Sequence, residues 1–151
     1  SRALYLLKGY SEDWIEKRMR GLAIQEELTS EWQKRGVKQQ NEYEILTAEI
    51  SKAAFGVTPS QYKKLKGLKR ENLRDHMDDF ELIFTMLGEK VTTEISKFEE
   101  PDTFPKNKKV AIRGGNVAGK ARKETEIEIG RSIVSKQNYL KTPESLKRLK
   151  H

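Results

Sequence analysis

The chain has 151 residues and a net charge of +7; 35% of its residues are hydrophobic and another 35% are charged. So small a hydrophobic fraction is typical of elongated helical proteins with a large exposed surface. The absence of cysteine excludes disulfides and thiolate metal sites and favours an intracellular protein. No apolar run approaches the roughly 18 residues that a membrane span needs, and no signal peptide is visible, so we expect no membrane partner.

Positive charge is concentrated towards the C-terminus. Residues 1–100 hold 17 lysines and arginines against 18 acidic residues, whereas residues 101–151 hold 13 against 5. Such an asymmetry is compatible with a basic tail that contacts nucleic acid. The alternative is a lysine-rich tail that only keeps the protein in solution.

The first predicted long helix follows a short leucine-rich opening. Because Ser1 and not methionine opens the sequence, we expect residues 1–10 to be the end of a missing upstream region. Ser11 is a predicted N-cap for a helix that continues to about Arg35 and ends at Gly36.

Two further long helices are predicted from apolar residues that recur every three or four positions. Residues 41–55 carry one apolar face, and residues 78–98 form the most hydrophobic helix of the chain, which we predict to be central to the core. Its predicted apolar stripe consists of Phe80, Ile83, Phe84, Leu87, Val91, Ile95 and Phe98.

Residues 55–77 read as two short helices separated by a glycine. Thr58 is a predicted N-cap with Pro59 in the first helical position, Gly67 ends this helix, and Leu68 begins the next. The pattern indicates either a solvated helical hairpin or a helix-turn-helix-like platform for nucleic acid. Its outward-facing cations would be Lys63, Lys64, Lys66, Lys69, Arg70 and Arg74.

Two prolines within residues 99–105 indicate a linker. We therefore predict an all-α fold with a helical core domain, residues 11–98, and a basic, partly extended C-terminal helical extension, residues 106–151. Within this extension we expect Gly114 and Gly115 to interrupt the helix.

Residues 114–120 match the first seven positions of a phosphate-binding P-loop. Ala121 stands where such a loop needs a serine or threonine for magnesium, and too few residues follow for the parallel sheet of a nucleotide hydrolase. The favoured interpretation is a glycine- and alanine-rich helix start that lets two helices approach closely. A third interpretation is anion binding without enzymatic activity. A nucleic-acid phosphate would then be held by Arg113, Lys120, Arg122 and Lys123.

The sequence contains no recognisable set of catalytic residues. The carboxylate clusters are typical of solvated helix faces, and neither His76 nor His151 has a second ligand at helical spacing. No serine is accompanied by a nearby histidine or a nucleophile-elbow motif. We expect neither an active site, nor a metal site, nor a cofactor.

Several short motifs follow one another in a fairly specific order: Gly36-Val37 with Tyr43 and Ile45-Leu46-Thr47, then Phe55-Gly56-Val57-Thr58 with Tyr62-Lys63, Lys66-Gly67-Leu68-Lys69, Glu71-Asn72-Leu73-Arg74-Asp75 with Met77, Thr92-Thr93-Glu94-Ile95-Ser96, Gly114-Gly115 with Val117-Ala118 and Ala121-Arg122, and Gly130 with Ile133-Val134-Ser135. Together they resemble the C-terminal region of the DNA-damage-inducible protein D family, which is related to phage antirepressors of the BRO type. The resemblance extends from about Tyr10 to Tyr139.

This resemblance implies a bacterial, cytoplasmic protein that is tied to the DNA-damage response or to a prophage. Members of that family usually carry a BRO-like domain ahead of this region, and their suggested activities are DNA binding and interference with repair or repressor machinery. No catalytic motif carries over.

From the charge pattern and the resemblance we expect a non-enzymatic regulator of the bacterial DNA-damage (SOS) response or of phage control. It would act by binding DNA or a DNA-bound protein, and a repair or repressor protein is a candidate partner. The alternative is a protein-interaction or oligomerisation module, for example a homodimer in which residues 12–35 and 115–122 pair with a second copy while the lysines only solubilise.

Overall fold

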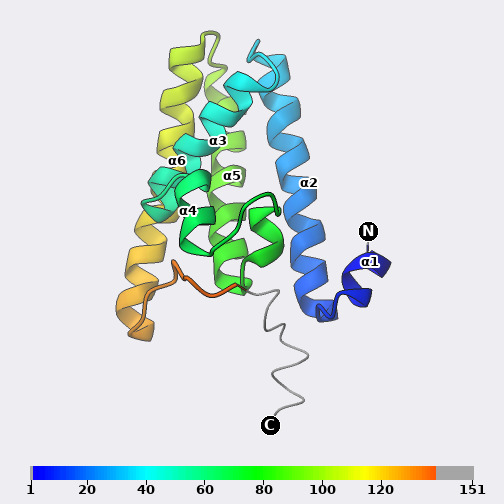
Figure 1. Cartoon of the computed structure of the whole chain (residues 1–151). Helices are drawn as coiled ribbons and strands as arrows, with labels where there is room; N and C mark the ends of the chain where they lie inside the picture. Colours follow the sequence, from blue (N-terminus) through cyan, green and yellow to red (C-terminus); the bar gives the residue numbers. More distant parts are fainter. Residues whose placement is uncertain (1, 139–151) are drawn as a thin grey trace.

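The computed structural model describes residues 2–138, and within them all secondary structure is helical, without strands (Figure 1). The predicted all-α class is thus confirmed for this part of the chain, whereas most of the predicted extended tail lies outside the described residues. The elements in chain order are α1 (Arg2–Leu7), α2 (Glu12–Lys34), α3 (Asn41–Phe55), α4 (Pro59–Leu65), the 3-10 turn η1 (Leu73–His76), α5 (Asp79–Glu99) and α6 (Phe104–Ile129).

The helices begin where side chains can bond to free backbone N–H groups. Ser11 caps α2 as predicted. Thr58 and Gln61 form a reciprocal capping box at the start of α4, and Asp78 and Glu81 form another at the start of α5. These hydrogen bonds satisfy donors that have no partner within the helix, which is why the local sequence alone locates these helix starts.

Four long helices form the body of the molecule. In Figure 1, α6 lies at one side, α2 lies at the other, and α5 runs between them. α5 packs against α2, α3 and α6, while α6 packs along both α3 and α5. Residues 104–129 therefore belong to the same bundle as residues 11–98, joined to α5 by only the four residues 100–103.

Glycines on one face of α6 let its backbone approach its neighbours. A Cβ atom built on Gly114 would lie 1.9 Å from Oγ1 of Thr92. A Cβ atom on Gly115 would lie 2.7 Å from the Cβ atom of Ala53. A Cβ atom on Gly119 would lie 2.3 Å from the carbonyl oxygen of the same residue. The predicted interruption at the glycine pair is wrong, because α6 continues unbroken through it. Its tertiary contacts outweigh the roughly 1 kcal/mol that each glycine costs in a helix interior.

The predicted apolar stripe of α5 is only partly right. Phe98 is 88% exposed, whereas Thr92, Thr93 and Ser96 are buried. Thr92 lies against Gly114 of α6, where the helices come close, and Ser96 donates a hydrogen bond to Glu31 of α2 at 3.1 Å. The hydroxyl of Thr92 donates to the carbonyl of Gly88 at 2.7 Å, so its burial leaves no donor unpaired.

Replacing Gly119 with alanine should lower the free energy of unfolding by about 1–3 kcal/mol, because the new methyl group collides with the backbone of α3. Gly21→Ala in α2 is the matched control. Its Cβ would meet only Met86 at 3.6 Å, so this change should be neutral or stabilise by up to about 1 kcal/mol. Urea unfolding of both variants tests this prediction, and equal losses in both would contradict it.

Candidate nucleic-acid interface

The stretch 55–77 contains one α-helix and not two. Gly67, at φ 71°, ends α4, and after it only Leu73–His76 forms a helical turn, of the 3-10 type. Between them the carboxylate of Glu71 accepts hydrogen bonds from two consecutive backbone N–H groups at 3.0 and 3.2 Å. These bonds satisfy the backbone without a helix. The predicted helix from Leu68, and with it the helix-turn-helix-like platform, is therefore wrong.

The ten cations predicted to bind nucleic acid fall into three groups by exposure. Three of them are directed into the protein: Lys66, Arg74 and Arg122. Lys63 is half-buried, and the remaining six are exposed: Lys64, Lys69, Arg70, Arg113, Lys120 and Lys123.

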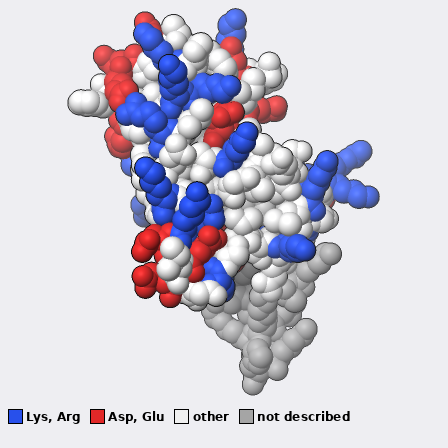
Figure 2. Space-filling view, turned by 90° about the vertical axis from the view of Figure 1, so that its left-hand side faces the viewer, with Lys and Arg blue, Asp and Glu red and all other residues white. Residues whose placement is uncertain are grey.

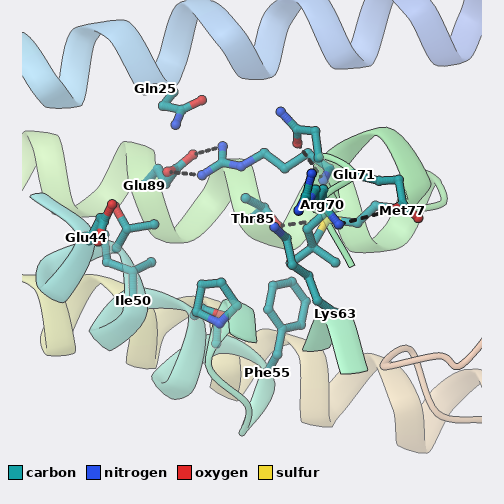
Figure 3. A pocket seen from close by; sticks show the side chains of 17 residues that line it. Gln25, Glu44, Ile50, Phe55, Lys63, Arg70, Glu71, Met77, Thr85 and Glu89 are labelled. Carbon is teal, nitrogen blue, oxygen red and sulfur yellow. Dashed lines mark hydrogen bonds and ion pairs between the residues drawn. The ribbon is translucent and has the colours of Figure 1, made fainter. Parts of the chain in front are cut away.

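Arg74 is engaged by an acidic residue of α5. Its two terminal nitrogens lie 2.8 Å from the two carboxylate oxygens of Glu89, and the side chains are only 14% and 2% exposed (Figure 3). Burial works against the charge of Arg74, but the Glu89 carboxylate outweighs it and raises the pKa of the guanidinium. This bidentate pair attaches the η1 region to α5.

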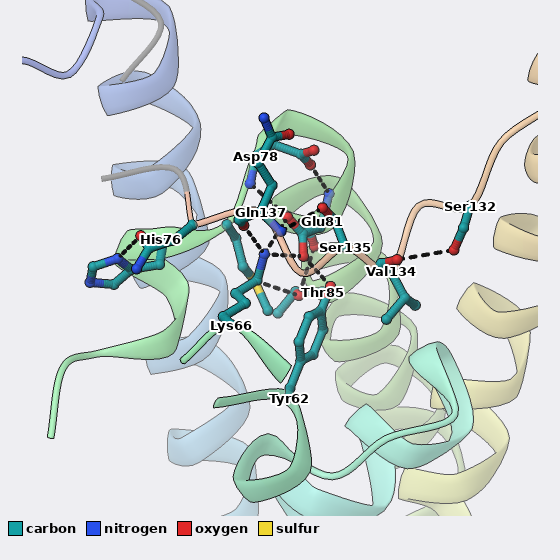
Figure 4. Close-up of polar contacts among 12 residues, drawn as sticks. Tyr62, Lys66, His76, Asp78, Glu81, Thr85, Ser132, Val134, Ser135 and Gln137 are labelled. Carbon is teal, nitrogen blue, oxygen red and sulfur yellow. Dashed lines mark hydrogen bonds and ion pairs between the residues drawn. The ribbon is translucent and has the colours of Figure 1, made fainter. Parts of the chain in front are cut away.

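Lys66 is at the centre of a buried polar cluster (Figure 4). Its side chain is 0% exposed, and its Nζ atom lies 2.9 Å from a carboxylate oxygen of Glu81. The hydroxyl of Tyr62 donates to the same carboxylate, and Nζ of Lys66 donates to the carbonyl of Gln137 at 2.6 Å. The expectation that Lys66 faces outward is thus wrong, because this lysine ties α4 to α5 and to the segment after α6.

Burial raises the pKa of Glu81, and hydrogen bonds from the Asp78 N–H group, Lys66 and Tyr62 partly offset this effect. The pKa of Tyr62 is raised by burial and by the neighbouring Glu81 charge. A buried carboxylate in such surroundings depends on its cation, since an unpaired buried charge is strongly unfavourable.

Arg122 performs a second structural task. Its Nε atom donates to the carbonyl of Ala54 at 2.7 Å, and Nη1 lies 2.8 Å from Glu126. Ala54 belongs to the last turn of α3, where carbonyl groups have no helical partner. Glu126 in turn accepts a hydrogen bond at 2.8 Å from the N–H group of Ile133, a fully buried residue. Arg122 therefore caps α3 and helps to dock the segment after α6.

The outward side of α6 carries a long run of positive charge. Residues 104–123 contain seven lysines and arginines and no acidic residue. Five of these cations are spaced three, four, seven and three residues apart, which places them on one helix face over about 25 Å. We call this set the α6 stripe: Lys106, Lys109, Arg113, Lys120 and Lys123. Figure 2 shows a band of lysine and arginine side chains on this side of the molecule.

Two members of the α6 stripe are already paired. Lys106 lies 3.1 Å from Asp102, and Arg113 makes a bidentate contact of 2.8 Å with Glu99. The other three members are exposed and form no ion pair within residues 2–138.

Lys106 and Lys109 were not predicted from the sequence as part of a nucleic-acid site. Their helical spacing to Arg113 was visible, but the expected break at the glycine pair concealed the continuous face.

The exposed cations of the α4 region belong to a separate surface. In Figure 2 uncharged surface lies between the central band and the basic side chains at the right-hand edge. The α4 region contributes Lys63, Lys64, Lys69 and Arg70, which lie on α4 and on the turn after it. The six exposed residues among the ten thus lie on two different parts of the fold, α6 and the α4 region.

No protein-family model, curated protein or solved structure matches this chain. The resemblance to the DNA-damage-inducible protein D family therefore stays a prediction. Among residues 2–138, no helix has both the length and the apolar character to cross a membrane, and no cluster of three acidic or histidine side chains could hold a metal ion.

Lys66→Met should lower the free energy of unfolding by about 3–5 kcal/mol, because it leaves the Glu81 carboxylate buried without a cation. Lys64→Met, at an exposed position two residues earlier, should change it by less than about 0.5 kcal/mol. The double variant Lys66→Met/Glu81→Gln should recover part of the loss. Denaturant unfolding measures all three, and a Lys66→Met protein as stable as the parent would disprove the structural role.

Proposed function

We propose that this chain is a non-enzymatic nucleic-acid-binding module that contacts its partner through the α6 stripe. The observation that carries the proposal is the run of twenty residues, 104–123, with seven cations and no acid, five of the cations on one face. A role in the bacterial DNA-damage response or in phage control is part of the proposal and rests on the family resemblance.

The chemistry of the α6 stripe suits a phosphate backbone better than base edges. Lysine is a flexible point charge that contacts phosphates without reading sequence. A stripe of about 25 Å matches roughly seven base-pair steps of duplex. Because Lys109, Lys120 and Lys123 have no acidic partner within residues 2–138, no ion pair must break when they meet a phosphate.

Exposed apolar side chains favour the alternative, a protein-interaction module. Leu7, Phe98 and Ile127 are 85%, 88% and 73% exposed. Light scattering combined with a DNA titration separates the two functions. An oligomer that ignores DNA would support the interaction module.

Removing three charges from the α6 stripe should weaken DNA binding and its dependence on salt. In the variant Lys109→Gln/Lys120→Gln/Lys123→Gln, the slope of log affinity against log salt should fall in magnitude by up to about 2.7, because each lost phosphate contact contributes about 0.9. Fluorescence anisotropy with a labelled duplex and a labelled single strand of equal length measures the slope.

The matched control removes three charges from the other side of the bundle: Lys8→Gln/Arg20→Gln/Lys34→Gln, all at exposed positions of α2 or just after α1. This control should keep most of the affinity. If both triple variants weaken binding equally, net charge and not the α6 stripe is responsible. Binding by the parent chain that does not change with salt would exclude phosphate contact altogether.

A further inference from the structure

A pocket of about 590 Å³ lies between α2, α3 and α5 and is closed on one side by the stretch 55–77 (Figure 3). Its volume is in the range of small-molecule sites. It is distinct from the α6 stripe, since no residue of α6 lines it.

The interior of the pocket combines flat apolar surface with fixed polar groups. Ile50, Phe55 and Met77 provide the apolar part. The Arg74–Glu89 pair provides the polar part. A guanidinium has five N–H donors, of which Glu89 takes two, and the remaining three make no hydrogen bond within residues 2–138. A purely apolar ligand would exclude water from these donors without offering them a hydrogen bond, which is unfavourable in free energy.

Two cations at the rim of the pocket are available to a negative group. Lys63 and Arg70 line this rim, and neither forms an ion pair within the described residues. Of the acidic lining residues, Glu89 is paired with Arg74. The carboxylate of Glu71 is held by backbone N–H groups, which lower its pKa. Glu44 and Glu71 thus both add negative charge, and the lining as a whole has three acidic and three basic residues.

We propose that this pocket binds a nucleotide. The flat base lies against Phe55 and Met77, its hydrogen-bonding edge faces Arg74, and the phosphate lies between Lys63 and Arg70. Free mononucleotides and an unstacked nucleotide of a single strand share this chemistry, since aromatic side chains bind extruded bases by stacking. If the ligand is a nucleotide of a single strand, this inference rests on the proposed function. If the ligand is a free mononucleotide, it does not.

The test titrates the full chain with AMP, GMP, CMP and UMP by calorimetry and follows backbone amide resonances by NMR. At least one nucleotide should bind saturably and shift resonances of the pocket lining. Ribose 5-phosphate should bind at least about tenfold more weakly, because it lacks the base. The pocket proposal is overturned if no nucleotide shifts these resonances, or if ribose 5-phosphate binds as tightly.

Two pairs of sequence neighbours supply a matched comparison. Lys63→Ala/Arg70→Ala removes the rim cations and should weaken nucleotide binding by about tenfold. Lys64→Ala/Lys69→Ala removes the same charge from adjacent residues that do not line the pocket and should leave affinity unchanged. Equal weakening by both variants would show diffuse charge attraction and overturn the assignment.

The failure of this inference differs from failure of the proposed function. The triple glutamine variant of the α6 stripe should lose DNA affinity and keep nucleotide affinity. Salt-dependent DNA binding without nucleotide binding would contradict the pocket proposal alone. Nucleotide binding without salt-dependent DNA binding would contradict the proposed role of the α6 stripe alone. If a single-stranded oligonucleotide displaces the bound nucleotide, the strand is a source of the ligand, and if it does not, the ligand is the free nucleotide.

Discussion

The close approach of α6 to α3 and α5 is the constraint on which the rest of the structure depends. It requires glycine at the points of closest approach, which are Gly114, Gly115 and Gly119. Such a contact packs a bundle tightly with few large apolar side chains, which fits the low hydrophobic content of the chain. Apart from Arg122, the lysines and arginines of residues 104–123 lie at exposed positions, and five of them form the α6 stripe.

Buried charge pairs perform a different task, which is to fix segments that have little secondary structure of their own. Lys66 with Glu81 holds α4 and receives the segment after α6. Arg74 with Glu89 holds the η1 region against α5. Buried pairs add little net stability, but each tolerates only one arrangement of the chain. The lysine-rich stretch 55–77 is therefore a docked part of the fold, and in this position it forms one wall of the pocket.

The two proposed surfaces differ in the chemistry that they offer. The α6 stripe presents mobile point charges on a rigid helix, an arrangement suited to a repeating anion such as a phosphate backbone. The pocket presents apolar surface and the Arg74–Glu89 pair inside, with two further cations at its rim, an arrangement suited to a single unit that carries one anionic group. A backbone contact and a base contact are complementary in nucleic-acid recognition, so the two proposals are compatible while resting on separate residues.

Local sequence was sufficient for the all-α class and for most helix ends, because caps such as Ser11 and Thr58 act within one turn of the chain. It was insufficient for the direction of individual cations. Lys64 and Lys66 are two residues apart and chemically identical, yet only the second meets Glu81, fifteen residues further along. Likewise, the preference of Gly114 to break a helix is local, whereas its contact with Thr92 is not. The sequence by itself determined where α2, α4 and α5 begin, because their caps are local, and how much positive charge the chain carries. Only the tertiary structure decided which charges are buried and which remain for a partner, because that choice depends on residues brought together by folding.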